Sequence, residues 1–267
     1  NFGAPFLLIA MDGQWQGVAQ VYAIILAITA VVFFLFTKND PASEERKRKG
    51  IRHESFKKQM EPLKDIQVWR FSLYYFFVFG AFVALALWLP RYYVGAYGLE
   101  LKTAGMLAAC YALPGSVFRA LGGWLSDVIG ARKVMYWTFI ASIFCTAIMS
   151  YPATDYTVAG INGPIHFNIT IPLEIFVLLT VVLGFFMSLG KAAVYKHIPV
   201  YYPNHVGSVG GVVGLIGGLG GFVLPITFGV MNDVIGVWTS CFMLLTLLVT
   251  IALTWMHFVI IAMDKKI

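Results

Sequence analysis

The chain has 267 residues, of which 59% are hydrophobic and only 12% are charged, and its mean hydropathy is +0.78. A soluble domain of this length does not carry so little charge, so the composition indicates an integral membrane protein. The formal net charge of +6 is then a signal of membrane topology rather than of nucleic-acid binding.

Seven apolar runs are long enough to cross a membrane as helices, so the sequence predicts an all-α integral membrane protein. The first ten residues resemble the tail of an earlier helix. The chain starts without methionine and has neither a basic n-region nor a small-residue cleavage site, so we expect a truncated start and no signal peptide. The three cysteines lie in apolar runs and are expected in the core, not in disulfides or a metal site. The predicted spans are 17–37, 68–90, 103–126, 134–151, 173–196, 207–230 and 238–263.

A long polar stretch, 38–64, separates the first two spans. This stretch, the alternate loops and the C-terminal tail would lie on one side of the membrane. Together they carry more basic side chains than the loops on the opposite side. The positive-inside rule therefore places this stretch and the C-terminus in the cytoplasm. We expect a solvated linker here, although a membrane-surface or partner site is an alternative. Its basic residues are Arg46, Lys47, Arg48, Lys49, Arg52, Lys57 and Lys58.

Arg119 lies inside the third predicted span, about eight residues, or ~12 Å along a helix, before Asp127. Placing an arginine at this depth costs about 2.5–3.5 kcal/mol or more. A buried carboxylate could offset that cost, but no acidic residue occurs at comparable depth in another span. We therefore predict that Arg119 binds an anionic ligand. Pro114 and Gly115, one turn earlier, should let this helix bend.

The segment 122–133, GGWLSDVIGARK, is predicted to be the loop that follows this span. Asp127 can cap the next helix or accept from Arg132, and Gly130 permits a tight turn. The conformational motif comprises Gly123, Asp127, Gly130, Arg132 and Lys133. A second copy at 228–238 repeats DVIG without the basic pair, which hints at the internal repeats of secondary transporters.

Lys191 is a second cation inside a predicted span. Three interpretations stay open for it: a side chain that reaches back to the cytoplasmic face, a contact with an anion, or a proton-linked coupling role. His197, near the end of the same span, is expected to be a surface or capping residue rather than a proton relay.

The stretch 207–225 contains eight glycines in nineteen residues. On an α-helix several of them form one face without side chains, and two more widen it. Because each helical glycine costs about 0.5–1 kcal/mol relative to alanine, this face indicates close approach by another helix or by a ligand. The first set is Gly207, Gly210, Gly214, Gly217 and Gly221; the second is Gly211 and Gly218.

These motifs resemble a known family. The segment 123–133 looks like the loop signature of the major facilitator superfamily, and the glycine stretch ending at Pro225 resembles the nitrate signature of its nitrate/nitrite porter family. RALGGWLSD, YFFVFGAF and GKAAVYKHIPVYYP are similar to that family's eighth, seventh and tenth helices. On the basis of these segments, which together cover nearly its whole length, the chain is identified as a member of this family.

The resemblance implies a twelve-helix carrier that transports nitrate, nitrite or both by alternating access. Residues 1–37 would be the end of the N-terminal bundle, 38–67 the cytoplasmic loop, and 68–267 the C-terminal six-helix bundle. The missing half would supply a second arginine and a second glycine signature. It also implies an anion site formed by Arg119, Tyr75, Phe79, Gly211, Gly214, Gly217 and Gly218.

The implied setting is a cell membrane, with the lipid bilayer, the nitrate or nitrite anion and, in a symporter, protons as partners. Lys191 replaces a small residue common in nitrite-exchanging members, which leaves proton-coupled import and nitrate/nitrite exchange both open. No cofactor, metal or nucleic acid is expected, and no cluster of catalytic residues points to an enzyme. The rivals are a carrier of another small anion and a seven-helix receptor with Lys191 as a retinal-type lysine.

Overall fold

The computed structural model describes residues 3–38, 44–45, 48 and 61–265. These fall into two compact units, Asn1–Glu61 and Pro62–Ile267. Apart from Arg48, the predicted basic cluster of the long loop lies outside the described residues.

The first unit contains two helices, α1 (Gly3–Ala10) and α2 (Trp15–Phe36). Asp12 and Gly13 adopt positive φ angles of 50° and 79° in the turn between them. The predicted span 17–37 is confirmed as α2. Its apolar side chains are largely exposed within this unit, as expected of a helix that is surrounded by lipid or by other helices.

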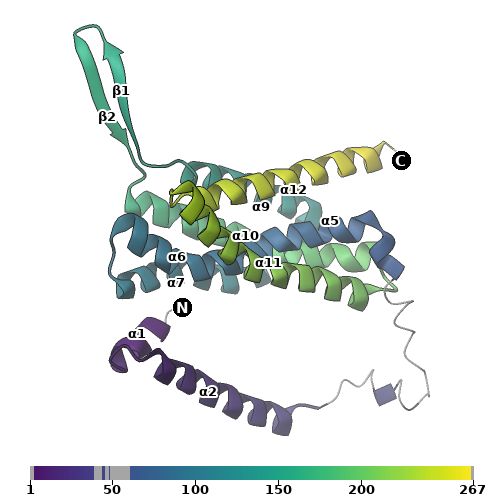
Figure 1. The fold of residues 1–267 in the computed structure, drawn as a ribbon. Helices are drawn as coiled ribbons and strands as arrows, with labels where there is room; N and C mark the ends of the chain where they lie inside the picture. Colours follow the sequence, from purple (N-terminus) through teal and green to yellow (C-terminus); the bar gives the residue numbers. More distant parts are fainter. Residues whose placement is uncertain (1–2, 39–43, 46–47, 49–60, 266–267) are drawn as a thin grey trace. The chain divides into compact units, whose positions relative to one another are not determined.

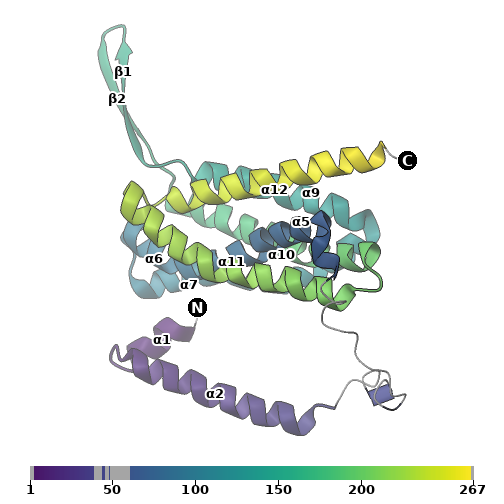
Figure 2. The ribbon, with the colours of Figure 1, turned by 45° about the vertical axis from the view of Figure 1, so that its right-hand side comes forward.

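The second unit is a helical bundle (Figures 1 and 2). Its first membrane-crossing rod is continuous and follows a short 3₁₀ turn, η1 (Glu61–Lys64). The remaining elements confirm the predicted spans to within a few residues at most ends, and the structure adds a break at Phe118. The rod consists of α5 (Ile66–Tyr75), the π-helical turn η2 (Phe76–Ala81) and α6 (Phe82–Tyr97); the others are α7 (Leu101–Val117), α8 (Arg119–Leu125), the π-helical turn η3 (Ser126–Gly130), α9 (Ala131–Met149), α10 (Leu173–Tyr201), α11 (Val206–Ile235) and α12 (Ser240–Asp264).

Six helical segments of the described chain are long and apolar enough to cross a membrane. The longest, Leu101–Met149, contains two of the predicted crossings, because the chain reverses at η3. Gly130 ends this turn with φ of +92°, a conformation that glycine adopts without a steric penalty. The expected tight turn at Gly130 is therefore confirmed. The rest of 122–133 is helical rather than a loop, because α8 runs to Leu125 and η3 follows directly.

Close backbone contacts hold the bundle together. The most buried long segment is the α5–η2–α6 rod, and α11 crosses it at glycines. A Cβ added to Gly80 would lie 2.7 Å from the carbonyl oxygen of Gly217 and 2.8 Å from the Cα atom of Gly220. On the other side, a Cβ added to Gly122 of α8 would lie 2.6 Å from the Cα atom of Leu189 in α10. Small residues thus allow the helices to touch, as in other membrane bundles.

A β-hairpin between α9 and α10 departs from the expected all-α architecture. Strands β1 (Thr154–Gly160) and β2 (Gly163–Ile169) pair antiparallel, with Thr154 opposite Ile169 and Gly160 opposite Gly163. Alternating residue types are a typical hairpin signal, and the turn consists of Ile161 and Asn162, with Gly163 paired to Gly160. The bundle itself is helical, so this correction concerns only the connection.

Candidate functional site

Arg119 is placed by a break in a membrane helix. Pro114 lies inside α7, and the helix is interrupted at Phe118, whose ψ angle is 3°. α8 begins at Arg119. The bend that the sequence predicted near Pro114 and Gly115 is thus present, one turn further along. It leaves the Arg119 side chain exposed, together with neighbours such as Val117, which is 70% exposed.

Two further helices bring side chains next to Arg119, and a third helix packs on one of these side chains. Its guanidinium interacts electrostatically with the Tyr75 hydroxyl, at the end of α5, and with the Lys191 ammonium of α10. Gly217 of α11 lies against the Tyr75 ring. Each of these residues lies about two to three helical turns inside the bundle, counted from the same end. The structure therefore brings together Arg119, Tyr75, Lys191 and Gly217, which the sequence identified separately.

Aromatic rings form one wall of this cluster. Tyr75 stacks on Phe79 with ring centroids 5.0 Å apart and planes 7° apart. Tyr195 meets the Tyr75 ring edge-on at 4.9 Å, and its hydroxyl donates to the Gly210 carbonyl at 3.2 Å. Tyr75 is only 4% exposed. These contacts fix the plane of the Tyr75 ring and hold its hydroxyl toward Arg119.

The first set of glycines packs against the bundle except at Gly207, where an added Cβ would meet nothing within 4 Å. A Cβ on Gly217 would lie 2.3 Å from Tyr75 Cδ1, and one on Gly214 would lie 2.9 Å from the Tyr195 hydroxyl. Side chains therefore cover these two glycines, so the close approach expected on this face is made by side chains of neighbouring helices. The aromatic rings take the space that the missing side chains leave.

Gly211 and Gly218 lie on a different face of α11. A Cβ on either would meet nothing within 4 Å, and both residues are exposed. They share this face with Leu215 and Phe222, which are 64% and 68% exposed. The glycines therefore form two faces, one packed on tyrosines and one open.

Lys191 points into the bundle rather than toward its end. The residue is 4% exposed, and its ammonium donates to the Gly115 carbonyl at 3.0 Å. The same nitrogen lies 3.1 Å from the centroid of the Phe82 ring, over its face. Reaching back to the membrane surface is therefore the wrong interpretation of Lys191. The Gly115 carbonyl, near the end of α7, and the face of the Phe82 ring hold this cation instead.

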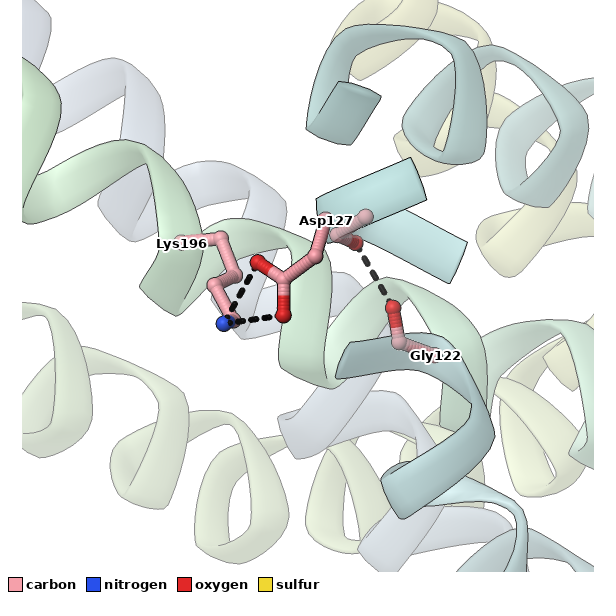
Figure 3. Close-up of polar contacts among 4 residues, drawn as sticks. Gly122, Asp127 and Lys196 are labelled. Carbon is pink, nitrogen blue, oxygen red and sulfur yellow. Dashed lines mark hydrogen bonds and ion pairs between the residues drawn. The ribbon is translucent and has the colours of Figure 1, made fainter. Parts of the chain in front are cut away.

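The turn at η3 carries an ion pair that the sequence did not predict. Lys196 Nζ lies 2.7 Å from both carboxylate oxygens of Asp127, so α10 is tied to η3 (Figure 3). Arg132 donates to the Tyr201 hydroxyl at 3.0 Å. Asp127 thus pairs with Lys196, because α10 passes beside the turn; the expected contact between Asp127 and Arg132 stays a prediction.

The two remaining motif residues and His197 are also located. A Cβ added to Gly123 would meet nothing within 4 Å, and Lys133 is exposed at the start of α9. His197 is 9% exposed; its Nδ1 atom lies 2.8 Å from the Ala193 carbonyl oxygen, and its ring packs on Phe71. The expected surface position of His197 is therefore wrong.

Sequence reasoning missed three residues of the cluster. Tyr195 contacts Tyr75, Phe82 contacts Lys191, and Gly80 allows α11 to approach the rod. Helical spacing offered a signal for Tyr195, since it follows Lys191 by four residues and so shares its face. No comparable signal pointed to Phe82, because its contact with Lys191 joins two segments far apart in the sequence.

The arrangement described above matches a known family. The family model of the Major Facilitator Superfamily matches residues 2–163 and 102–265. The chain belongs to the Major Facilitator Superfamily. It is therefore a multi-pass membrane protein of a transporter family, which fits the expectation that it is not an enzyme. A crystal structure of the superfamily transporter FucP in the outward conformation has a TM-score of 0.60 and 17% identity, and supports the fold over 95% of this chain and 57% of that one.

Similar proteins agree with the resemblance to nitrate/nitrite porters. A probable nitrate/nitrite antiporter NarK1 of Thermus thermophilus is 41% identical over 96% of this chain and 57% of its own length. The nitrite extrusion protein of Bacillus subtilis is 29% identical over 92% and 55%, and a probable nitrate transporter NarT of Staphylococcus epidermidis is 26% identical over 100% and 61%. The chain thus spans little more than half the length of these relatives.

Proposed function

We propose that this superfamily member is part of a secondary transporter that carries nitrate, nitrite or both by alternating access. The observation that carries the proposal is an exposed guanidinium, Arg119, two turns inside a membrane bundle and beside a tyrosine hydroxyl. The names of the similar proteins support the choice of anion.

The chemistry of the cluster suits a small planar anion. A guanidinium is planar and donates two parallel hydrogen bonds to a planar oxyanion, whereas an ammonium acts as a point charge. The Tyr75 hydroxyl adds a neutral donor, and the stacked Tyr75 and Phe79 rings give a flat apolar wall. Arg119 and Lys191 repel each other electrostatically, so a bound anion relieves their repulsion.

Alternating access requires a partner for the face on which Arg119 lies. We infer that residues 68–267 form the C-terminal bundle and that a second bundle, whose end includes residues 1–37, closes the site with its own arginine and glycine signature. The exposed Gly211 and Gly218 would then approach that bundle or the anion. In this scheme the transporter lies in the cell membrane with its C-terminus in the cytoplasm, and residues 1–267 expressed alone do not transport.

The test is anion uptake by the full-length gene product in cells that lack their own nitrate transport. Arg119→Lys keeps the charge but removes the planar donor, so we expect uptake to fall sharply. Unchanged uptake in Arg119→Lys would reject bidentate recognition. Competition by unlabelled nitrite, phosphate and carboxylates then decides the anion: stronger inhibition by phosphate or carboxylates than by nitrite would favour a carrier of another anion.

Lys191 is the candidate for coupling, since it is a buried cation beside the anion site. Vesicles loaded with nitrite and vesicles with an imposed proton gradient separate the two mechanisms. Nitrate uptake driven by the proton gradient alone indicates symport, and uptake that needs internal nitrite indicates antiport. Symport lost in Lys191→Met with nitrate binding retained would support the coupling role.

A further inference from the structure

The hairpin between α9 and α10 has one apolar and one polar face. Cross-strand partners lie on the same face of an antiparallel pair, and successive residues alternate between faces. The pairs Tyr156–Phe167 and Val158–Ile165 therefore share a face with the Thr154–Ile169 pair. The apolar side chains of this face are exposed: Val158 46%, Ile165 57%, Phe167 44% and Ile169 43%. Ile161 at the tip is fully exposed, at 104%.

The opposite face is polar and internally paired. Asn168 donates to Asp155 at 2.6 Å, and the Thr157 hydroxyl lies 2.8 Å from His166 Nδ1. Asp155 is the one carboxylate of the two strands. The hairpin thus resembles the amphipathic elements that lie at a membrane surface, with side chains that hydrogen-bond on one side and apolar side chains on the other.

The root of the hairpin lies at a level rich in tyrosine and tryptophan. A cavity of about 600 Å³ is lined by Tyr92, Tyr97, Tyr151 and Trp238, and also by the residues that enter and leave the hairpin, such as Pro152 and Ile171. The Tyr97 hydroxyl donates to the Ile171 carbonyl at 3.1 Å. Tyrosine and tryptophan are enriched where membrane helices reach the headgroups, so the hairpin starts at this level.

The hairpin also runs across the direction of the helices rather than along it. In Figures 1 and 2 the strands project sideways from the end of the bundle, across the direction of α9 and α12. They leave the bundle on the side of these two helices, which expose the apolar side chains of Ile140, Phe144 and Leu247. The hairpin and the exposed apolar side chains of α9 and α12 thus belong to the same side of the bundle.

We propose that this hairpin lies in the headgroup region of the bilayer beside α9 and α12, with the face of Tyr156, Val158, Ile165, Phe167 and Ile169 toward the acyl chains. The occupant of the apolar face is phospholipid. Attraction to anionic lipids is not needed, because the strands carry a single carboxylate and no lysine or arginine. Burial of apolar area drives the contact.

The experiment places single spin labels on both faces of the full-length gene product in phosphatidylcholine vesicles. Val158→Cys and Ile165→Cys report on the apolar face, and Thr157→Cys and Ala159→Cys are matched controls on the neighbouring positions of the polar face. Other cysteines are replaced first, including Cys110, which is exposed although the sequence predicted it in the core. Collision rates with oxygen, which enters lipid, and with a water-soluble nickel chelate are then measured for each label.

We expect labels at 158 and 165 to collide with oxygen more and with nickel less than labels at 157 and 159. Four labels that are equally open to nickel would overturn the proposal, because the hairpin would then stand in water or be disordered. Labels at 158 and 165 that are shielded from both reagents would also overturn it, since a protein surface would then cover the apolar face.

Discussion

The ring of Tyr75 takes the place that a side chain at position 217 would need. A Cβ on Gly217 would lie 2.3 Å from Tyr75 Cδ1, and the hydroxyl of the same ring is held near Arg119. Tyr75 therefore links Gly217 of α11 to Arg119 of α8. The contact gives Gly217 a positioning role: its missing side chain sets where the Tyr75 hydroxyl lies.

Gly217→Ala should therefore disturb both packing and transport. The methyl group must displace a ring that is itself stacked on Phe79, and such overpacking costs about 1–3 kcal/mol. Gly218→Ala is the matched control, because its Cβ meets nothing within 4 Å and alanine favours the helix. We expect a lower unfolding midpoint for Gly217→Ala than for Gly218→Ala, and weaker nitrate uptake for Gly217→Ala than for the unmodified protein. Equal midpoints in the two variants would contradict the contact.

The helices could be predicted from sequence because each is a long apolar run, and a run of this length has few alternatives in a membrane. The spans 173–196 and 207–230 both fall within observed helices. The hairpin was missed for the opposite reason: its strands are only seven residues each, and the segment was treated as a loop. A pattern of period two over seven residues gives a much weaker signal than a hydrophobic run of twenty.

The site was predictable in its parts but not in its contacts. Arg119 stood out because a charge inside a span is costly, and glycine spacing marked one face of α11. Which side chain covers Gly217 depends on how α5 and α11 cross, and a sequence without an alignment carries no record of that crossing. The same holds for Lys196, which pairs with Asp127 only because α10 passes beside η3.

Lys191→Met should destabilise the bundle more than the same change at Lys196. Lys191 is buried and donates to the Gly115 carbonyl, and an unsatisfied buried polar group costs about 1–3 kcal/mol. Lys196 lies five residues away on α10 in an exposed ion pair, and such pairs contribute about 0–1 kcal/mol. Unfolding titrations of both variants in the same detergent measure the difference. A larger loss in Lys196→Met would show that the Lys191 contact is not structural.

The Asp127–Lys196 pair should matter more for transport than for stability. Its side chains are 61% and 45% exposed, so each single charge reversal should change the free energy of unfolding by about 1 kcal/mol or less. The pair ties η3 to α10, so breaking it should change how readily these elements move during transport. We expect uptake to fall in Asp127→Lys and in Lys196→Asp and to recover in the double variant. No recovery would mean that the two residues act independently.

Tyr202 should link the stability of one end of the bundle to alkaline pH. It follows α10, and its hydroxyl donates to the carboxylate of Asp65. The same carboxylate caps α5, because it accepts from the backbone N–H of Gln67 at 2.9 Å. Burial, and then the hydrogen bond to Asp65, raises the pKa of Tyr202 above its usual value. The folded state thus favours the neutral phenol, so this stabilisation is present below pH ~10 and is lost as the pH rises further.

Tyr202→Phe removes both the hydrogen bond and its pH dependence. At pH 7 we expect the variant to be less stable than the unmodified protein by about 0.5–1.5 kcal/mol. The difference should shrink above pH 10, since only the unmodified protein then loses stability at this position. Thermal unfolding of both proteins from pH 7 to pH 11 measures it, and Tyr201→Phe is a control because the Tyr201 hydroxyl accepts from Arg132 instead. A difference that stays constant over this range would show that the Tyr202 hydroxyl does not titrate as proposed.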